Sequence, residues 1–114
     1  MEKLNNADVL KNFVTSPIAA IISMKNCGGY VARFSVSFNY QGAHLKKDSG
    51  EFTAGVKKSI EIPAGATNIV IKAEEAWFIA SWSTIFHQQH PVPVTKCYEL
   101  TGTTLSPGWR EVAC

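Results

Sequence analysis

The sequence predicts an all-β fold, a sandwich or barrel of antiparallel sheets, and three observations support it. Short segments of alternating apolar and polar residues recur along the chain, and turn residues separate them at intervals of about 8–12 residues. No helical pattern stands between them as a crossover, which favours antiparallel pairing. At 114 residues, with 46% hydrophobic and 18% charged, the chain has the size and composition of one globular domain.

The first 16 residues read differently from the rest. Asn6 can cap a short helix that Pro17 would limit. Four apolar residues of this segment share one helical face: Val9, Leu10, Phe13 and Val14. We therefore expect an N-terminal extension with a short helix over residues 1–16 and a β-sandwich over residues 17–114.

The clearest strand lies in residues 30–40. Its apolar face is formed by alternate residues, Tyr30, Ala32, Phe34, Val36, Phe38 and Tyr40, and its other face is mostly polar. Turn residues bound it, with two glycines before it and Gln41 and Gly42 after it. This pattern predicts a strand with one face in the core.

Weaker strand patterns follow toward the C-terminus. They cover residues 58–62, 68–72, 82–86, 92–100 and 109–113. Alternation places Trp82, Thr84 and Phe86 on one face of their segment. In the next segment it places Val92, Val94, Tyr98 and Leu100 on one side.

Catalysis, metal binding and nucleic-acid binding find little support in the sequence. The net charge is +2, and no cluster of basic residues suits a phosphate backbone. Motifs for a serine nucleophile, a nucleotide phosphate and a zinc protease are missing. His87 and His90 have no third metal ligand nearby, and the adjacent Glu74 and Glu75 would point to opposite faces of a strand. We expect neither enzyme activity, nor a cofactor, nor a metal.

The three cysteines, Cys27, Cys97 and Cys114, do not suggest a disulfide framework. We expect free thiols, with Cys114 able to pair between chains. The N-terminus shows no apolar signal segment, and no apolar run is long enough to span a bilayer. The expected location is therefore cytoplasmic, or outside the cell by a non-classical route, with any membrane contact peripheral.

An aromatic stretch over residues 75–82 is the unusual feature of the chain. It contains Trp77, Phe78 and Trp82 and lacks the charge expected of a solvated loop. One interpretation is core packing, since aromatic residues dominate cores. The other is an exposed loop that inserts among lipid headgroups or stacks on a sugar.

Four segments in order resemble the C-terminal domain, domain 4, of the thiol-activated, cholesterol-dependent cytolysins. They are residues 28–38, 68–75, 82–86 and 102–107, and the resemblance covers about residues 20–113. It implies a sandwich of two four-stranded sheets, with residues 26–29, 53–55, 77–81 and 104–105 gathered at one end. It also implies that Thr104 and Leu105 correspond to the sterol-recognition pair of the family.

The chain departs from the family in the Trp-rich loop. Ala76 stands where the family has a reactive Cys, and Ser81, Trp82 and Ser83 stand where it has Trp-Trp-Arg. In the family, preceding domains build the pore, and 114 residues leave no room for them. The resemblance therefore implies a recognition module that is unable to form pores alone.

Three functions remain open from the sequence. The first is binding to a sterol-containing membrane, with the site residues Thr104, Leu105, Trp77, Phe78 and Trp82. The second is a lectin-like glycan site, formed by Trp82, Asn26, Gln88, Gln89 and His90. The third is an oligomeric interaction protein without a small ligand, whose aromatic stretch is core or a dimer interface.

Overall fold

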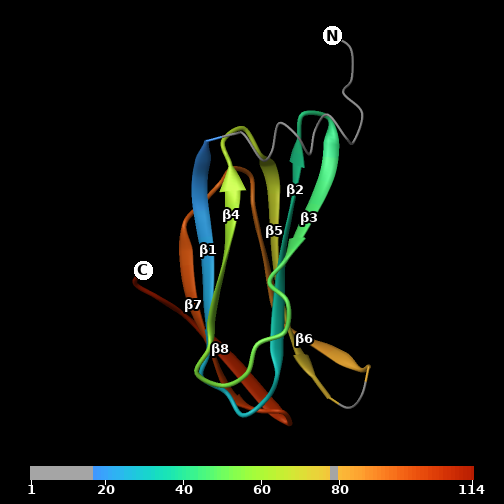
Figure 1. Ribbon diagram of the computed structural model, residues 1–114, viewed down its shortest axis with the longest axis vertical. Helices are drawn as coiled ribbons and strands as arrows, with labels where there is room; N and C mark the ends of the chain where they lie inside the picture. Colours follow the sequence, from blue (N-terminus) through green and yellow to red (C-terminus); the bar gives the residue numbers. More distant parts are fainter. Residues whose placement is uncertain (1–16, 78–79) are drawn as a thin grey trace.

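The computed structural model describes residues 17–77 and 80–114, and these form two four-stranded sheets packed face to face (Figure 1). The eight strands are β1 (Ile18–Asn26), β2 (Ala32–Tyr40), β3 (Ala43–Asp48), β4 (Lys57–Pro63), β5 (Thr67–Ala76), β6 (Trp82–His90), β7 (Lys96–Thr103) and β8 (Ser106–Val112). The predicted all-β sandwich is confirmed. The expected helix and extension over residues 1–16 lie outside the described residues.

One strand pair departs from the antiparallel expectation. The first sheet has the order β4-β1-β7-β8 and the second has the order β3-β2-β5-β6. All neighbours pair antiparallel except β1 and β7, which are parallel. A parallel pair needs a long return path, and the strands β2 to β6 supply it here without a helix. The absence of helical crossovers was therefore an insufficient reason to expect antiparallel pairing throughout.

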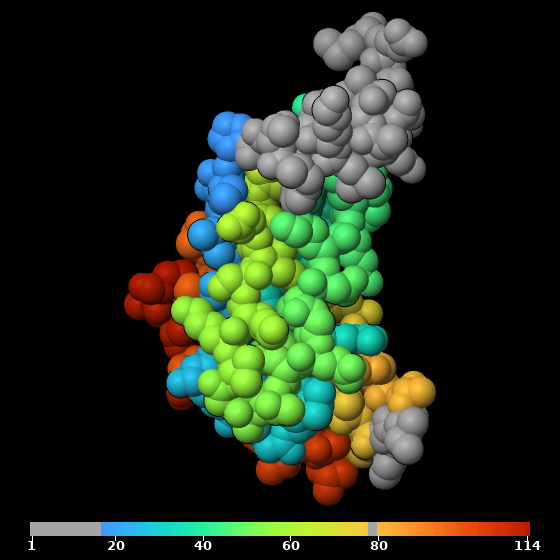
Figure 2. Space-filling model, viewed as in Figure 1, coloured from blue at the N-terminus to red at the C-terminus, as the bar shows by residue number. Residues whose placement is uncertain are grey.

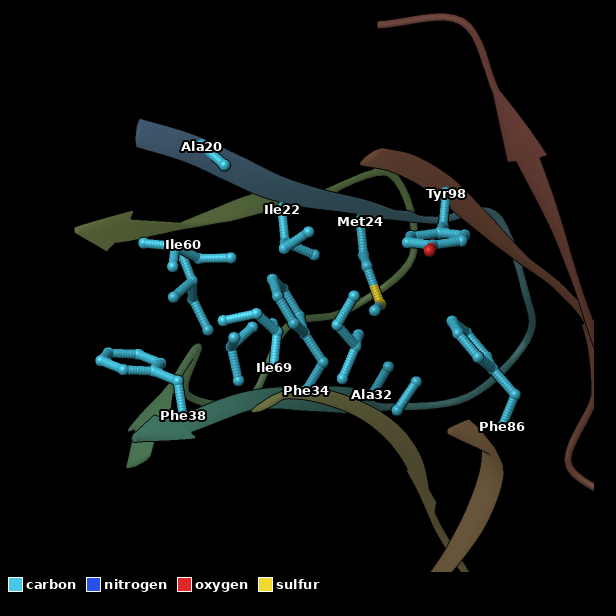
Figure 3. Close-up of a cluster of buried hydrophobic side chains, with 14 of the residues drawn as sticks. Ala20, Ile22, Met24, Ala32, Phe34, Phe38, Ile60, Ile69, Phe86 and Tyr98 are labelled. Carbon is cyan, nitrogen blue, oxygen red and sulfur yellow. The ribbon is translucent and has the colours of Figure 1, made fainter. Parts of the chain in front are cut away.

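The core lies between the two sheets. All six residues of the predicted apolar face over residues 30–40 are buried. Figure 3 shows Ile22, Met24 and Tyr98 of the first sheet pointing toward Phe34 and Ile69 of the second. Because each fully buried side chain of this size contributes about 1.5–3 kcal/mol, these contacts hold the sheets together.

A β-bulge in β6 reverses the face on which its aromatic residues lie. Phe86 pairs with Ala73, but the next partner of β5 is Thr84, which leaves Ile85 as the extra residue. Phe86 therefore points into the core, whereas Trp82 and Thr84 belong to the outer face. The prediction that these three residues share one face was wrong, because alternation does not hold across a bulge.

The expected strand over residues 92–100 is shorter than its pattern suggested. Strand β7 begins at Lys96, and Val92 is 56% exposed in the loop before it. Pro91 and Pro93 have no N–H to donate to a ladder, which explains the late start. Only Tyr98 and Leu100 of the predicted apolar side are buried in the core.

An aromatic cluster closes the seam between the edge strands β6 and β8. The rings of Phe86 and Trp109 stack with their centroids 4.2 Å apart, and the ring of Tyr98 lies 5.1 Å from that of Phe86. The Tyr98 hydroxyl donates a hydrogen bond of 2.6 Å to the side-chain oxygen of Gln88. This cluster fixes one side of the sandwich.

Cys97 and Cys114 form a disulfide, which corrects the expectation of free thiols or of pairing between chains. Strand β8 runs antiparallel beside β7, and Cys97 lies opposite Val112. The chain end that follows therefore stays close to β7, and the Cα atoms of the two cysteines are 5.2 Å apart. The third cysteine, Cys27, is free and exposed.

Candidate functional site

Four connections meet at one end of the sandwich, and we call this end the tip (Figures 1 and 2). They are residues 27–31, 49–56, 77–81 and 104–105, of which residues 78–79 are not described. Strands β1, β3, β5 and β7 run toward the tip, and the strands that follow them run back. Figure 2 shows the β1–β2, β3–β4 and β7–β8 connections together at the lower end.

Thr104 and Leu105 form the turn between β7 and β8. Thr103 pairs with Ser106 on either side of the turn. Gly102 has a φ of +83°, and a Cβ added there would collide with the carbonyl oxygen of Ser106, so the hairpin requires glycine at this position. Leu105 is 82% exposed, the largest value among the exposed large apolar residues that the structure describes. The turn therefore presents an apolar side chain to solvent beside hydroxyl-bearing residues.

Asn26 binds two of the tip loops together from the inside. It is fully buried, and its Nδ2 donates to the carbonyl oxygens of Tyr30, at 2.7 Å, and Phe52, at 3.2 Å. Its Oδ1 accepts a hydrogen bond of 2.9 Å from the backbone N–H of Gly28. All the polar atoms of this side chain are thus used within the fold, so Asn26 is unable to offer its amide to a glycan.

The β1–β2 connection is also attached to the β7–β8 hairpin. The Gly29 N–H donates to the Gly102 carbonyl at 3.0 Å, and the Tyr30 hydroxyl donates to the Thr101 carbonyl at 2.8 Å. Burial raises the pKa of Tyr30 to about 12, and the nearby Glu75 adds to the rise. Tyr30 therefore stays protonated and keeps donating at physiological pH, which holds the Leu105 turn against the rest of the tip.

Trp82 lies on the outer face of the second sheet, beside the tip. The Arg33 guanidinium carbon is 3.8 Å from the centroid of the Trp82 ring. Arg33 also donates from Nε to the Glu74 carboxylate at 3.1 Å. A cation–π contact near the surface contributes about 0.5–1 kcal/mol. One face of the Trp82 ring is therefore covered by a cation, and the residue belongs to a partly exposed surface.

Trp77 and Glu75 stand where β5 enters the loop. The backbone N–H of Trp77 donates to the Ser81 carbonyl at 2.9 Å, and Ala80, which lies between them, has a φ of +64°. Glu75 is fully buried, and burial raises the pKa of its carboxyl. The Trp77 indole approaches this carboxyl and lowers the pKa to a smaller extent, although neither Glu75 oxygen has a hydrogen bond of standard geometry among the described residues. Trp77 is itself partly buried, and Phe78 lies outside the described residues.

The residues of the predicted glycan site are not brought together. Gln88 is engaged by Tyr98, and Gln89 and His90 lie at the far end of β6. At about 3.3 Å per residue, His90 is roughly 25 Å from Trp82 along the strand. Gln89 and His90 instead line a hollow with Asn68, Val70 and Pro91, at the end of the sandwich opposite the tip.

Two residues of the site were missed by the sequence reasoning as functional candidates. Glu75 continues the inward-facing series of β5, after Ile69, Ile71 and Ala73, so its burial could have been predicted from alternation alone. Arg33 is the only basic residue of β2, but nothing in its local sequence indicates Trp82 as its partner.

Within residues 17–77 and 80–114, no helix is long and apolar enough to cross a bilayer. The same part of the chain contains no group of three or more His, Cys, Asp or Glu residues that could hold a metal ion.

A comparison with family models matches residues 21–108 to the thiol-activated cytolysin beta sandwich domain. The chain belongs to this family. The match begins within β1 and ends within β8, and it includes the four connections of the tip. A search of curated proteins finds no match.

Solved cytolysin structures share the fold. The membrane-binding domain of pneumolysin is 20% identical, with a TM-score of 0.62 over 83% of this chain and 96% of that domain. Suilysin from Streptococcus suis is 20% identical with a TM-score of 0.61, and listeriolysin O is 24% identical with a TM-score of 0.60. The matches cover 82% and 83% of this chain, which spans 23% of suilysin and 22% of listeriolysin O. A further match is intermedilysin, in a structure with human CD59.

Proposed function

We propose that this cytolysin-family sandwich is a non-enzymatic recognition module that binds sterol-containing membranes through its tip. The observation that carries the proposal is Leu105, which is 82% exposed at the end of a turn that Gly102 and the β1–β2 connection hold in place. Transfer of a leucine side chain out of water contributes about 1.5–3 kcal/mol. Because the turn is already held in place before binding, less ordering cost offsets that transfer.

The chemistry of the turn suits a sterol. A sterol has one hydroxyl and a rigid apolar body, and Thr104 offers a hydroxyl beside the Leu105 side chain. The hydrogen bond adds about 1 kcal/mol net. Because one such contact is weak, we infer that Trp77 and Trp82 contribute to the membrane contact, or that several copies bind together. Phe78, the remaining residue expected at this site, lies outside the described residues. The module would then act at the periphery of a membrane.

Sedimentation with phosphatidylcholine vesicles, with and without cholesterol, tests the proposal. Leu105→Ala is expected to weaken binding by roughly tenfold, since it removes most of an apolar side chain worth about 2 kcal/mol. Val92→Ala is the matched control, because Val92 is also exposed but lies at the other end of the sandwich. Equal binding by both variants, or no binding of the wild type to cholesterol vesicles, would refute the proposal.

Glycan binding is the second candidate, and the hollow opposite the tip is the observation that favours it. Asn68, Gln89 and His90 line this hollow, and His90 Nε2 is buried without a hydrogen bond among the described residues. Amide and imidazole groups are suited to sugar hydroxyls. Binding on a glycan array that Gln89→Ala abolishes and Leu105→Ala leaves intact would support it. A stable oligomer in sedimentation, with neither vesicle nor glycan binding, would favour the interaction protein instead.

A further inference from the structure

A small hollow lies on the outer face of the first sheet. Its volume is about 160 Å³, and residues of all four strands line it, among them Ser23 and Lys25 of β1 and Lys57 of β4. Val112 and Ala113 form part of its wall. The next residue, Cys114, is bonded to Cys97, so the disulfide holds this wall beside β7.

Two lysines meet at the hollow from neighbouring strands. Lys25 and Lys57 are direct ladder partners in the antiparallel pair of β1 and β4, and both are exposed. Like charges directly opposite each other on a sheet are destabilising, because their Cβ atoms are only about 4.5–5.5 Å apart. Among the described residues, neither lysine has an ion pair. An anion bound between them would relieve this repulsion.

One carboxylate, that of Glu99, also lines the hollow, but a cation already neutralises it. Glu99 lies beside Lys25 in the β1–β7 register and opposite Arg110 on β8. The Arg110 Nε donates to the Glu99 carboxylate at 2.7 Å. Because Glu99 is engaged by Arg110, the two lysines leave the hollow with an excess of positive charge.

A buried hydroxyl completes the set of donors. Ser23 is only 6% exposed, although it belongs to the outer face between the core residues Ile22 and Met24. Its Oγ lies 2.7 Å from the Oγ of Ser59, and either hydroxyl can donate. When Ser59 donates, the proton of Ser23 is left for an acceptor in the hollow. A hydroxyl donor beside two ammonium groups suits an oxyanion, because hydrogen bonds to charged acceptors are the strong ones.

The size of the hollow restricts the class of anion. Pockets for drug-sized ligands measure about 300–1,000 Å³, so a hollow of about 160 Å³ is too small for a whole glycan or nucleotide. It has room for one compact group with several oxygens. A phosphate monoester carries three strong acceptor oxygens and up to two negative charges, which match one hydroxyl and two ammonium groups.

We propose that this hollow binds a phosphate monoester group through Lys25, Lys57 and Ser23. A small soluble molecule or a lipid headgroup could carry this group, and the position of the hollow favours the soluble molecule. Glu99 lies four residues before the end of β7, so the hollow is at least roughly 13 Å from the Leu105 turn. The headgroup layer of one leaflet is only about 5–7 Å thick, so the phosphate of a simple phospholipid would not reach the hollow while Leu105 contacts the membrane.

Titration with inorganic phosphate tests the site. The backbone amide signals of the full chain, labelled with ¹⁵N, are followed by NMR while sodium chloride keeps the ionic strength constant. Two charge-assisted hydrogen bonds support a dissociation constant on the order of 1 mM. We expect shifts at Ser23, Lys25 and Lys57 that saturate with this constant.

Lys25→Gln should raise the dissociation constant about tenfold, since it removes one charge-assisted hydrogen bond. Lys58→Gln is the matched control, because it removes the same charge next to Lys57 but lies opposite Met24, on the other face of β4. Shifts that do not saturate, or equal weakening in both variants, would overturn the proposal, because they would show attraction to the net charge alone. The wild-type titration needs no variant, so the test holds even where Lys25→Gln fails to fold.

Sedimentation with vesicles distinguishes the two carriers of the phosphate group. The vesicles contain phosphatidylcholine with or without phosphatidic acid, and no cholesterol. We expect phosphatidic acid to cause no pelleting that depends on Lys25. Pelleting that Lys25→Gln abolishes, in the absence of saturable shifts with inorganic phosphate, would overturn the soluble carrier and assign the hollow to a headgroup.

This site and the proposed sterol site fail separately. Saturable phosphate shifts in a protein that binds no cholesterol vesicles would remove the sterol function and leave the phosphate site in place. Binding to cholesterol vesicles without saturable phosphate shifts would do the reverse.

Discussion

Replacement of Asn26 by alanine tests whether one buried side chain assembles the tip. The substitution removes hydrogen bonds to three buried backbone groups, the carbonyls of Tyr30 and Phe52 and the N–H of Gly28. Each such bond contributes about 1 kcal/mol net, so we expect Asn26→Ala to lower the free energy of unfolding by about 3 kcal/mol. Because the same bonds hold the β1–β2 and β3–β4 connections, vesicle binding through Leu105 should also weaken.

Urea denaturation followed by intrinsic fluorescence gives the free energy of unfolding, and an unchanged slope shows that the unfolding transition is comparable. Asn39→Ala is the matched control, because Asn39 makes an exposed hydrogen bond to His44 at 3.0 Å and should lose less than about 0.5 kcal/mol. A loss below about 1 kcal/mol for Asn26→Ala, or equal losses for both variants, would refute the reasoning.

Three further predictions concern stability. Cys114→Ser removes the disulfide to Cys97 across a separation of 17 residues, and we expect a loss of about 3 kcal/mol by urea denaturation, which a reducing agent reproduces in the wild type only. Glu75→Gln should raise the free energy of unfolding at neutral pH and leave it unchanged at acidic pH. The pKa of the Glu75 carboxyl is raised in the folded state, so the wild type loses stability as pH rises above 4.5. A difference between variant and wild type that stays constant across pH would contradict this. Gly102→Ala should destabilise the β7–β8 hairpin by more than about 1 kcal/mol, measured by thermal unfolding, whereas Gly108→Ala, where φ is not positive, should be milder; equal effects would contradict the positive-φ argument.

Local alternation accounts for most of the fold that could be predicted. The buried face of β2 emerged from the sequence because side chains on a strand alternate strictly between core and solvent. The same rule failed in β6, where the bulge at Ile85 shifts the register, and before β7, where two prolines delay the strand. Both failures come from backbone features that change the ladder without changing the apolar pattern.

The candidate site was predicted in part. The order of family-like segments led to Thr104 and Leu105, and the structure places them at the tip with Leu105 exposed. The proposed glycan set was built from residue chemistry alone, and its members are separated because Asn26 points inward and β6 carries His90 away from Trp82. The chemical type of a residue predicted membership of a site less well than its position along a strand did, because residues at opposite ends of a strand lie far apart.

The sequence by itself indicated the strands other than β1 and β3, the main turns and the family, because alternation, turn residues and motif order are local properties of the chain. Only the tertiary structure decided the parallel pairing of β1 with β7, the bond between Cys97 and Cys114, and the contact of Arg33 with Trp82. Each of these joins residues far apart in sequence, so it depends on how the sheets assemble. The turn at Thr104 and Leu105 depends on both the sequence and the tertiary structure. Its residues were identified from the sequence, but its place at the tip follows from the packing of four connections at one end.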